Sequence, residues 1–338
     1  MLRLRLRLLD LDAAAWHLRA WVRLGASAKQ LRGETLNPSQ TQIGQILDEF
    51  RLDGAVLAAL VKLRDQPAAA RIGLLLELVR DNPDHTPSAI GLLAALREAG
   101  MLDAAPTPAA RPIPLRIAQY WADPEPPPDL LPLLQSWQDH HPGHAWRLYD
   151  DAAAAAFLAG RFPAEILAAY RLAALPAQKA DIFRLAWLFL EGGLYADVDD
   201  RCHAALPTLL PPGTTFAGYL EEFGTIGNNL LAVAPGHPVI GRAMQLAAQS
   251  VNRGDADVVW LATGPGLITR AFAQILAEAE VPPAVALGGC VLLDRGRLGR
   301  TVAMHCAVDY KQGRQHWLRS VFGGQGPQVV MRPLPVPG

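Results

Sequence analysis

The sequence predicts an α/β fold in which a mostly parallel sheet is flanked by helices and preceded by a small all-α domain. After residue 112, short strand-like runs such as 113–119 and 145–149 alternate with helical runs such as 126–140 and 238–251. Such alternation is typical of parallel sheets that are covered by helices. Before residue 104, apolar residues recur only at helical spacing.

A proline-rich stretch separates the two patterns. Prolines recur at alternate positions in residues 105–112, which disfavours both helix and central strand. We therefore expect a helical domain at 1–104, a linker at 105–112, the α/β domain at 113–326 and a proline-rich tail at 327–338.

The helical domain is expected to contain about five short amphipathic helices. Leu11, Leu18 and Val22 form an apolar stripe, and Asn37-Pro38 and Thr86-Pro87 are typical helix starts. No fixed repeat period emerges, so a packed accessory domain is favoured over a helical repeat that binds a protein partner. Both interpretations stay open.

Composition narrows the class of protein. The chain has 338 residues, of which 51% are hydrophobic and 19% charged, as in globular proteins. Its formal net charge of −1 gives no reason to expect nucleic acid or an anionic membrane as a partner. Three scattered cysteines indicate a reducing compartment, and no apolar run reaches membrane-spanning length. A cytoplasmic location is the simplest expectation.

The strongest chemical pattern lies in residues 176–200. An apolar helix is predicted to start near Pro176 and to end at Gly192-Gly193. A short strand then leads into Asp197-Val198-Asp199, so the period of two places both carboxylates on one face. Carboxylates so placed repel each other unless a proton or a cation lies between them. A hard divalent ion that bridges to substrate phosphates fits this need.

Nine positions in this segment carry a resemblance to a known family. They follow the pattern Lys-x-Asp-x-x-Arg, then Leu, Gly-Gly, Tyr and Asp-x-Asp, and they are Lys179, Asp181, Arg184, Leu188, Gly192, Gly193, Tyr195, Asp197 and Asp199. The pattern is similar to the sugar-binding region of glycosyltransferase family 32, and the likeness extends over about residues 111–320. It implies a GT-A-like fold and a UDP- or GDP-hexose donor. It also implies Mn²⁺ or Mg²⁺, retention at the anomeric carbon, and a glycan, lipid-linked or small-molecule acceptor.

The resemblance assigns roles to individual side chains. Asp197 and Asp199 would hold the metal ion, while Asp181 and Arg184 would bind hydroxyls of the donor sugar. His305 is the first candidate for a further metal ligand and His316 the second. The basic and aromatic residues near them would cover the diphosphate of the donor, and these are Lys311, Arg314 and Trp317.

Further donor-binding candidates lie at expected strand ends and turns. Gln119, Tyr120 and Trp121 end the first strand, although Ala118 stands where the family usually has histidine. An aromatic face there could stack on a nucleotide base or cap the core, and both options stay open. Asn228 precedes an apolar strand, and a plain turn is its more common role. Thr263 and Gly264 precede a helix that starts at Pro265, where free backbone amides could bind an anion.

Two other functions are compatible with an acidic pair at a strand end. In a metal-dependent phosphohydrolase or phosphotransferase, Asp197 would attack phosphorus and Asp199 would act as the acid. Arg201 occupies the position where those enzymes usually carry Thr or Val, which argues against this alternative. A non-catalytic sugar-binding protein derived from a transferase is the third possibility, and the intact acidic pair argues against it.

Overall fold

The computed structural model describes residues 54–63, 66–102, 112–221, 224–255 and 258–312. A six-stranded sheet lies at its centre, with strand order β2-β1-β3-β6-β5-β7. The strands are β1 (Arg116–Tyr120), β2 (Ala145–Tyr149), β3 (Gly193–Ala196), β5 (Phe216–Leu220), β6 (Leu230–Val233) and β7 (Cys290–Asp294). Only β6 runs antiparallel to its neighbours in this sheet. The predicted α/β fold with a mostly parallel sheet is confirmed.

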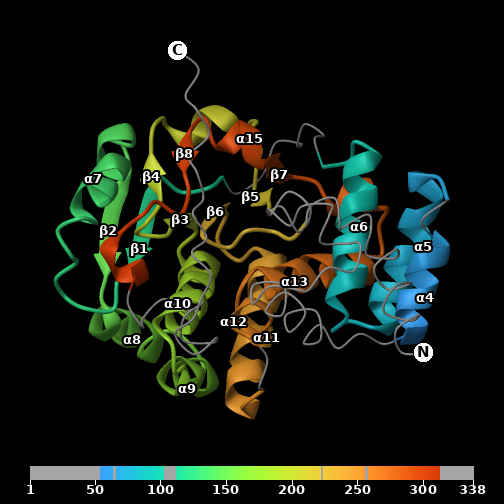
Figure 1. Ribbon diagram of the computed structural model, residues 1–338, viewed down its shortest axis with the longest axis horizontal. Coiled ribbons are helices and arrows are strands. Elements are labelled where there is room, and N and C mark those ends of the chain that lie inside the picture. Colours follow the sequence, from blue (N-terminus) through green and yellow to red (C-terminus); the bar gives the residue numbers. More distant parts are fainter. Residues whose placement is uncertain (1–53, 64–65, 103–111, 222–223, 256–257, 313–338) are drawn as a thin grey trace, which may run out of the picture.

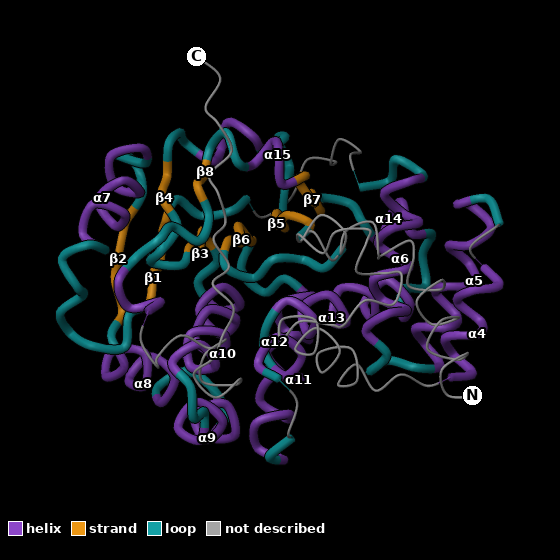
Figure 2. Tube along the Cα trace, viewed as in Figure 1, coloured by secondary structure: helices purple, strands orange, loops and turns teal. Residues whose placement is uncertain are grey.

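Helices cover both faces of the sheet (Figures 1 and 2). One face carries α8 (Asp151–Ala159), α9 (Ala164–Leu172), α10 (Pro176–Leu190), α11 (Pro238–Arg253), α12 (Val259–Ala262) and α13 (Pro265–Glu278). The other face carries α7 (Leu131–His140), α15 (Arg295–Leu298) and a separate pair of short strands, β4 (Arg201–Cys202) and β8 (Val302–Ala303). Short helices lie at Leu206–Leu209, α14 (Pro283–Ala286) and Asp309–Gln312.

The alternation of side chains along each strand builds two hydrophobic clusters. On β3, Tyr195 joins the cluster under α10, α11 and α13, whereas Leu194 and Ala196 join the cluster on the opposite face. On β1, Ala118 and Ile117 divide in the same way. Burial on both faces explains why β3, β5 and β6 read as nearly continuous apolar runs, whereas the edge strand β2 is partly exposed.

The described N-terminal helices share this core. They are α4 (Gly54–Leu63), α5 (Ala68–Asp81) and α6 (Thr86–Glu98), and Leu75 and Leu92 lie in the same hydrophobic cluster as Phe272 of α13. Arg80 donates to the carbonyl oxygen of Ala277 at 2.6 Å. The predicted boundaries stay predictions, because most of the linker, the helices expected before residue 54 and the tail lie outside the described residues.

The transition from α10 to β3 has the predicted glycine stop. Gly192 and Gly193 have φ angles of 64° and 110°, which disfavour residues with a side chain. A Cβ atom on Gly193 would lie 2.6 Å from the carbonyl oxygen of Arg116, so this strand meets β1 at a distance that only glycine allows.

One prediction about this segment is wrong. The strand ends at Ala196, where its pairing with Leu230 of β6 ends, and the next residues form a turn. The amide of Asp200 donates to the carbonyl oxygen of Asp197 at 3.1 Å. The period-two argument therefore does not apply, and Asp197 and Asp199 do not share a strand face.

Among the described residues, no helix is both long enough and apolar enough to cross a bilayer.

Candidate active site

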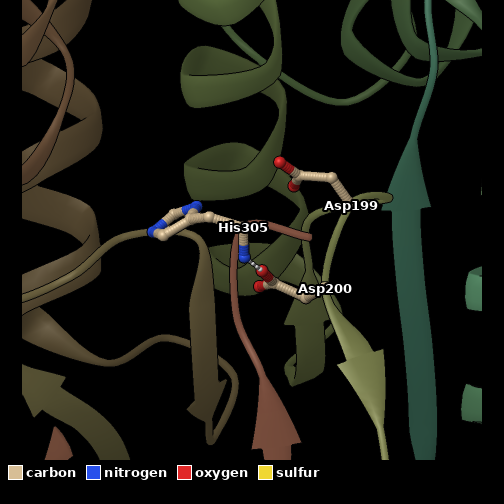
Figure 3. Close-up of side chains that lie close together, drawn as sticks. All are labelled: Asp199, Asp200 and His305. Carbon is tan, nitrogen blue, oxygen red and sulfur yellow. Dashed lines mark hydrogen bonds between the residues drawn. The ribbon is translucent and has the colours of Figure 1, made fainter. Parts of the chain in front are cut away.

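Two carboxylates and an imidazole converge on the turn that follows β3. Ligand atoms of Asp199, Asp200 and His305 all lie within 4.8 Å of one another (Figure 3). Asp200 is fully buried, and one of its oxygens accepts the backbone N–H of His305 at 2.8 Å. Its other oxygen accepts from the side-chain amide of Asn229 at 2.6 Å.

The β4–β8 strand pair brings these distant residues together. β4 begins directly after Asp200, and Arg201 pairs with Ala303 of β8, two residues before His305. The amide of Cys306 then donates to the carbonyl oxygen of Asp199 at 2.8 Å. Trp137 of α7 donates its indole N–H to the carbonyl oxygen of Asp200 at 2.9 Å. The backbone carbonyl groups of the turn are thus held by one backbone amide and one side-chain indole.

Negative charge is concentrated at this turn. Burial raises the pKa of the Asp200 carboxyl well above its usual range, and the charges of Asp199 and Asp197 raise it further. Burial is also the largest single influence on Asp199, but the charges of Lys311 and His305 and the hydrogen bonds from Lys311 and Tyr310 together outweigh it and hold the pKa of that carboxyl below its ordinary value. Lys311 forms an ion pair with Asp199 and donates to the carbonyl oxygen of Cys306 at 2.8 Å. The structure therefore places the Lys311 ammonium against Asp199, while the carboxylates of Asp197, Asp199 and Asp200 lie close enough to repel one another.

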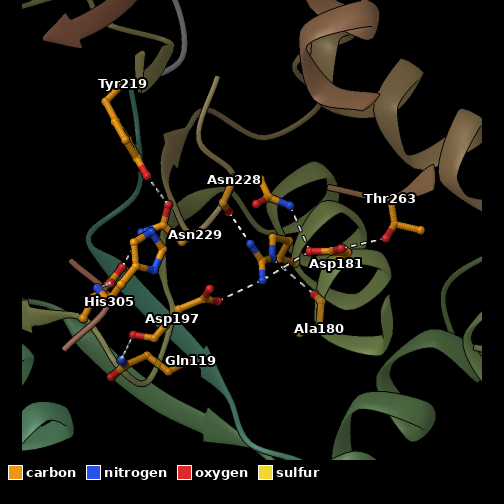
Figure 4. Close-up of polar contacts among 11 residues, drawn as sticks. Gln119, Ala180, Asp181, Asp197, Tyr219, Asn228, Asn229, Thr263 and His305 are labelled. Carbon is orange, nitrogen blue, oxygen red and sulfur yellow. Dashed lines mark hydrogen bonds and ion pairs between the residues drawn. The ribbon is translucent and has the colours of Figure 1, made fainter. Parts of the chain in front are cut away.

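Arg184 connects the other polar residues of the site, and Figure 4 labels its partners Asp181, Asp197 and Asn228. This buried guanidinium donates to Asp197 at 2.8 Å and to the carbonyl oxygen of Asn228, and it lies 3.3 Å from Asp181. It also lies over the ring of Tyr195, 4.7 Å from the ring centroid, as in cation–π contacts. The predicted contact between Asp181 and Arg184 is present, with Asp197 as an additional partner.

Asp181 is held by two hydrogen-bond donors from other segments. It accepts from the Asn228 amide at 2.9 Å and from the Thr263 hydroxyl at 2.6 Å. Asp181 and Arg184 are only 4% and 3% exposed. The side chain of Asp197 is 27% exposed, and it is the most accessible carboxylate of the network. Burial, opposed by Arg184 and reinforced by Asp199, raises the pKa of Asp197 to about 7.

The three candidates at the end of β1 occupy different environments. Gln119 is fully buried, donates to the carbonyl oxygen of Asp197 at 3.3 Å and accepts from Trp146 at 2.9 Å. Tyr120 is buried and donates its hydroxyl to Asp151 at 3.2 Å. Trp121 is only half-buried and meets the ring of Tyr310 edge-on, with centroids 5.1 Å apart. Of these three, Trp121 alone presents part of its side chain to solvent near the acidic turn.

The remaining candidates divide between described and undescribed residues. Thr263 contacts Asp181, whereas the amide of Gly264 is taken by the carbonyl oxygen of Val259 at 2.9 Å and is not a free anion donor. Arg314, His316 and Trp317 lie outside the described residues.

Sequence reasoning missed Asp200 and Asn229 as members of the site. Asn229 accepts from the Tyr219 hydroxyl at 2.6 Å while it donates to Asp200, so its orientation is determined by both contacts. The available signals were the third carboxylate directly after Asp199 and the second asparagine directly after Asn228.

Comparison with known proteins agrees with this geometry. Residues 127–216, which include α10, β3 and the acidic turn, match the family described as "Glycosyltransferase sugar-binding region containing DXD motif". Residues 127–216 are therefore similar to a glycosyltransferase sugar-binding region. The Asp-x-Asp of this region is Asp197-Val198-Asp199, and the resemblance inferred from the sequence is confirmed.

Curated relatives are glycosyltransferases and toxins. Inositol phosphoceramide mannosyltransferase 2 of Schizosaccharomyces pombe is 28% identical over 192 residues, which cover 54% of this chain and 53% of that protein. Toxin Afp18 of Yersinia ruckeri is 35% identical over 103 residues, or 29% of this chain and 5% of the toxin. The chain thus matches about half of the mannosyltransferase and a small part of the toxin. Among solved structures, PaToxG Glycosyltransferase aligns with a TM-score of 0.42 and 20% identity, over 61% of this chain and 79% of that one.

Proposed function

We propose that the protein is a metal-dependent glycosyltransferase that moves a hexose from a nucleotide-diphosphate sugar to an acceptor. One observation supports this most directly. The residues with ligand atoms within 4.8 Å, Asp199, Asp200 and His305, lie directly beside the buried Asp197–Arg184–Asp181 network. A cation site and a hydroxyl-binding site that share one turn suit a substrate with a diphosphate at one end and a sugar at the other.

The chemistry of the donor set fits a divalent ion. Two carboxylates and one imidazole suit Mn²⁺, and the oxygen donors also suit Mg²⁺. A cation would relieve the repulsion that raises the pKa of Asp200. We therefore assign the metal to Asp199, Asp200 and His305, and we assign Asp197, which pairs with Arg184, to the donor's ribose or sugar hydroxyls. When bound, the ion neutralises charge on the departing diphosphate as a Lewis acid.

Other residues of the chain complete the proposed donor site. Lys311 would move its ammonium from Asp199 to the diphosphate when a metal ion takes its place, and it would stabilise the negative charge that develops there. The half-buried Trp121 offers a ring face to the nucleotide base. Asp181 and Arg184 would bind sugar hydroxyls. Coverage of the diphosphate by Arg314 and Trp317 stays a prediction, as does His316 as an alternative ligand.

The proposal also covers the class of sugar donor and the class of acceptor. The mannosyltransferase relatives support a hexose donor, carried by UDP or GDP. A glycan, a lipid-linked sugar or a small molecule would accept it, in the cytoplasm. We propose retention of the anomeric configuration, which NMR of the first-formed product distinguishes from inversion by the chemical shift of the anomeric proton and its one-bond coupling to C1.

A binding experiment tests the proposal. Thermal stability is measured with UDP, GDP, UDP-glucose and GDP-mannose, each with and without Mn²⁺, because a ligand of the folded state raises the apparent stability. Stabilisation should need Mn²⁺ and should vanish in Asp199→Asn. The matched control is Asp139→Asn, which removes an exposed carboxylate on α7. Hydrolysis of the donor should stop in excess chelator. Equal stabilisation with and without Mn²⁺ would refute the metal dependence.

A further inference from the structure

Two consecutive residues of α13 hold the two segments that supply the hydrogen-bond donors of Asp181. Asn228 and Thr263 approach Asp181 from different loops, as Figure 4 shows. Each of these loops is tied to α13 two residues before its donor. Thr269 binds the loop that carries Asn228, and Arg270 binds the segment that carries Thr263.

Thr269 uses its hydroxyl group fully. Its oxygen accepts the backbone N–H of Ile226 at 2.9 Å, and its proton is donated to the carbonyl oxygen of Pro265 at 2.7 Å. Thr269 and Ile226 are both completely buried. Gly227 then passes so close to the ring of Tyr219 that an added Cβ would lie 2.2 Å away. The Thr269 hydroxyl, the close contact with the Tyr219 ring and the hydrogen bond from the Gly227 amide to the carbonyl oxygen of Tyr219, 3.0 Å, therefore all hold the path of the chain into Asn228.

Arg270 acts on the other segment. It donates to the carbonyl oxygen of Leu261 at 2.9 Å, in the four-residue helix α12, which Thr263 follows directly. A helix of one turn is not stable by itself and needs such external contacts. The same guanidinium donates to the hydroxyl of Thr86, the first residue of α6, at 2.8 Å. Leu261 also packs against Ile90 of α6.

Asp181 has capacity for one more donor. A carboxylate offers about four acceptor sites, and Asn228, Thr263 and Arg184 occupy three of them. A sugar hydroxyl can take the fourth only if the first three hold the carboxylate in the correct orientation. The orientation of the Asp181 carboxylate therefore depends on the contacts that hold Asn228 and Thr263 in place.

We propose that Thr269 and Arg270 are positioning residues for the Asp181 pocket, and that Thr86 brings the N-terminal helices into the same support. The proposal rests on the proposed function in one respect, that Asp181 accepts a hydroxyl of the donor sugar. Neither residue touches the donor. α13 packs against both α6 and α12 (Figure 1), and in this proposal the three helices together support Asn228 and Thr263 beside Asp181. The helices before residue 104 then contribute to sugar binding through Thr86 and Arg270.

The test compares two pairs of variants. Thr269→Val removes the hydroxyl and keeps the shape, whereas Thr269→Ser keeps the hydroxyl. Arg270→Gln removes the guanidinium, and Arg242→Gln is its matched control. Arg242 of α11 also binds α13, but through Gln274 and Glu278. Two measurements are made, namely hydrogen–deuterium exchange of backbone amides in the ligand-free protein and binding of four ligands in Mn²⁺. The ligands are UDP, GDP, UDP-glucose and GDP-mannose.

Local exchange reports the positioning without any assumption about function. Thr269→Val should accelerate exchange at residues 226–229 about fivefold or more, and Arg270→Gln should do the same at 261–264, since each loses hydrogen bonds that close its segment. Thr269→Ser and Arg242→Gln should leave both segments at the rates of the wild-type protein. Unchanged exchange in both Thr269→Val and Arg270→Gln would overturn the proposal.

Binding reports the consequence for the sugar. Affinity for the nucleotide sugar should fall roughly three- to tenfold in Thr269→Val and Arg270→Gln, while affinity for the bare nucleotide diphosphate stays within about twofold. An equal loss for both ligands would overturn the assignment to the sugar side of the pocket. Absence of binding by the wild-type protein to all four ligands would refute the proposed function instead, and the exchange result would still decide the positioning.

Discussion

Replacement of Arg184 by Met should destabilise the protein strongly, and the structure explains by how much. The guanidinium is 3% exposed and donates to Asp197 and to the carbonyl oxygen of Asn228, while Asp181 lies 3.3 Å away. Methionine keeps much of the aliphatic volume but leaves the buried Asp181 and the partly buried Asp197 without their cation. Removing one partner of a buried ion pair costs about 3–5 kcal/mol, because the remaining charge stays buried and uncompensated.

A double mutant separates the two parts of this destabilisation, namely the hydrogen bonds that are lost and the carboxylate charge that is left without a partner. In Arg184→Met with Asp197→Asn, one of the two stranded charges is gone, so part of the lost stability should return. The loss of unfolding free energy in the double variant should therefore differ from the sum of the two single losses by about 1–3 kcal/mol, as it does for charges in direct contact. At pH 8, above the raised pKa of Asp197 near 7, the carboxylate is mostly ionised and the effect is largest.

Urea denaturation measures both quantities as the free energy of unfolding. The metal-free protein is used, so that ligand binding does not contribute to the measured stability. A loss below about 1 kcal/mol for Arg184→Met, as for an exposed pair, would refute the argument from burial. Strict additivity of the two substitutions would refute the direct charge coupling.

Three further predictions concern the rest of the fold. Gly193→Ala should cost more than about 2 kcal/mol in urea denaturation, because φ is 110° and the new Cβ meets the Arg116 carbonyl, whereas Gly73→Ala in α5 should stabilise by up to about 1 kcal/mol. Burial lowers the pKa of His237 to about 4, so only the unfolded state gains this proton between pH 6.5 and 4. The free energy of unfolding should fall there by up to about 1.4 kcal/mol per pH unit, and a titration of His237→Gln should lack this component. A chain that starts at Arg111 should unfold at lower urea than the full chain, because it exposes the surface of α13 that α5 and α6 cover. An equal midpoint would show that these helices fold separately.

The acidic turn is a place where the period-two pattern of a strand gave a wrong prediction. The alternation rule placed Asp197 and Asp199 on one face because a strand was expected to continue through them. The strand pairing with β6 ends at Ala196, and the chain then turns, since the Asp200 amide donates to the carbonyl oxygen of Asp197 at 3.1 Å. The local sequence does not indicate where pairing with a partner strand ends, because that depends on the tertiary structure.

By itself the sequence determined the elements whose signals are local. Pro176 and Gly192-Gly193 delimit α10, and Ala145–Tyr149 forms the strand that its composition predicts, because dihedral preferences and periodicity act over a few residues. The spacing of Asp181 and Arg184 on one helix likewise predicted their contact. Only the tertiary structure decided that Asp200 and His305, 105 residues apart, would meet, and that Asn228 and Thr263 would both point at Asp181. Those contacts depend on how β4 pairs with β8 and how α13 packs, and no short stretch of sequence encodes either arrangement.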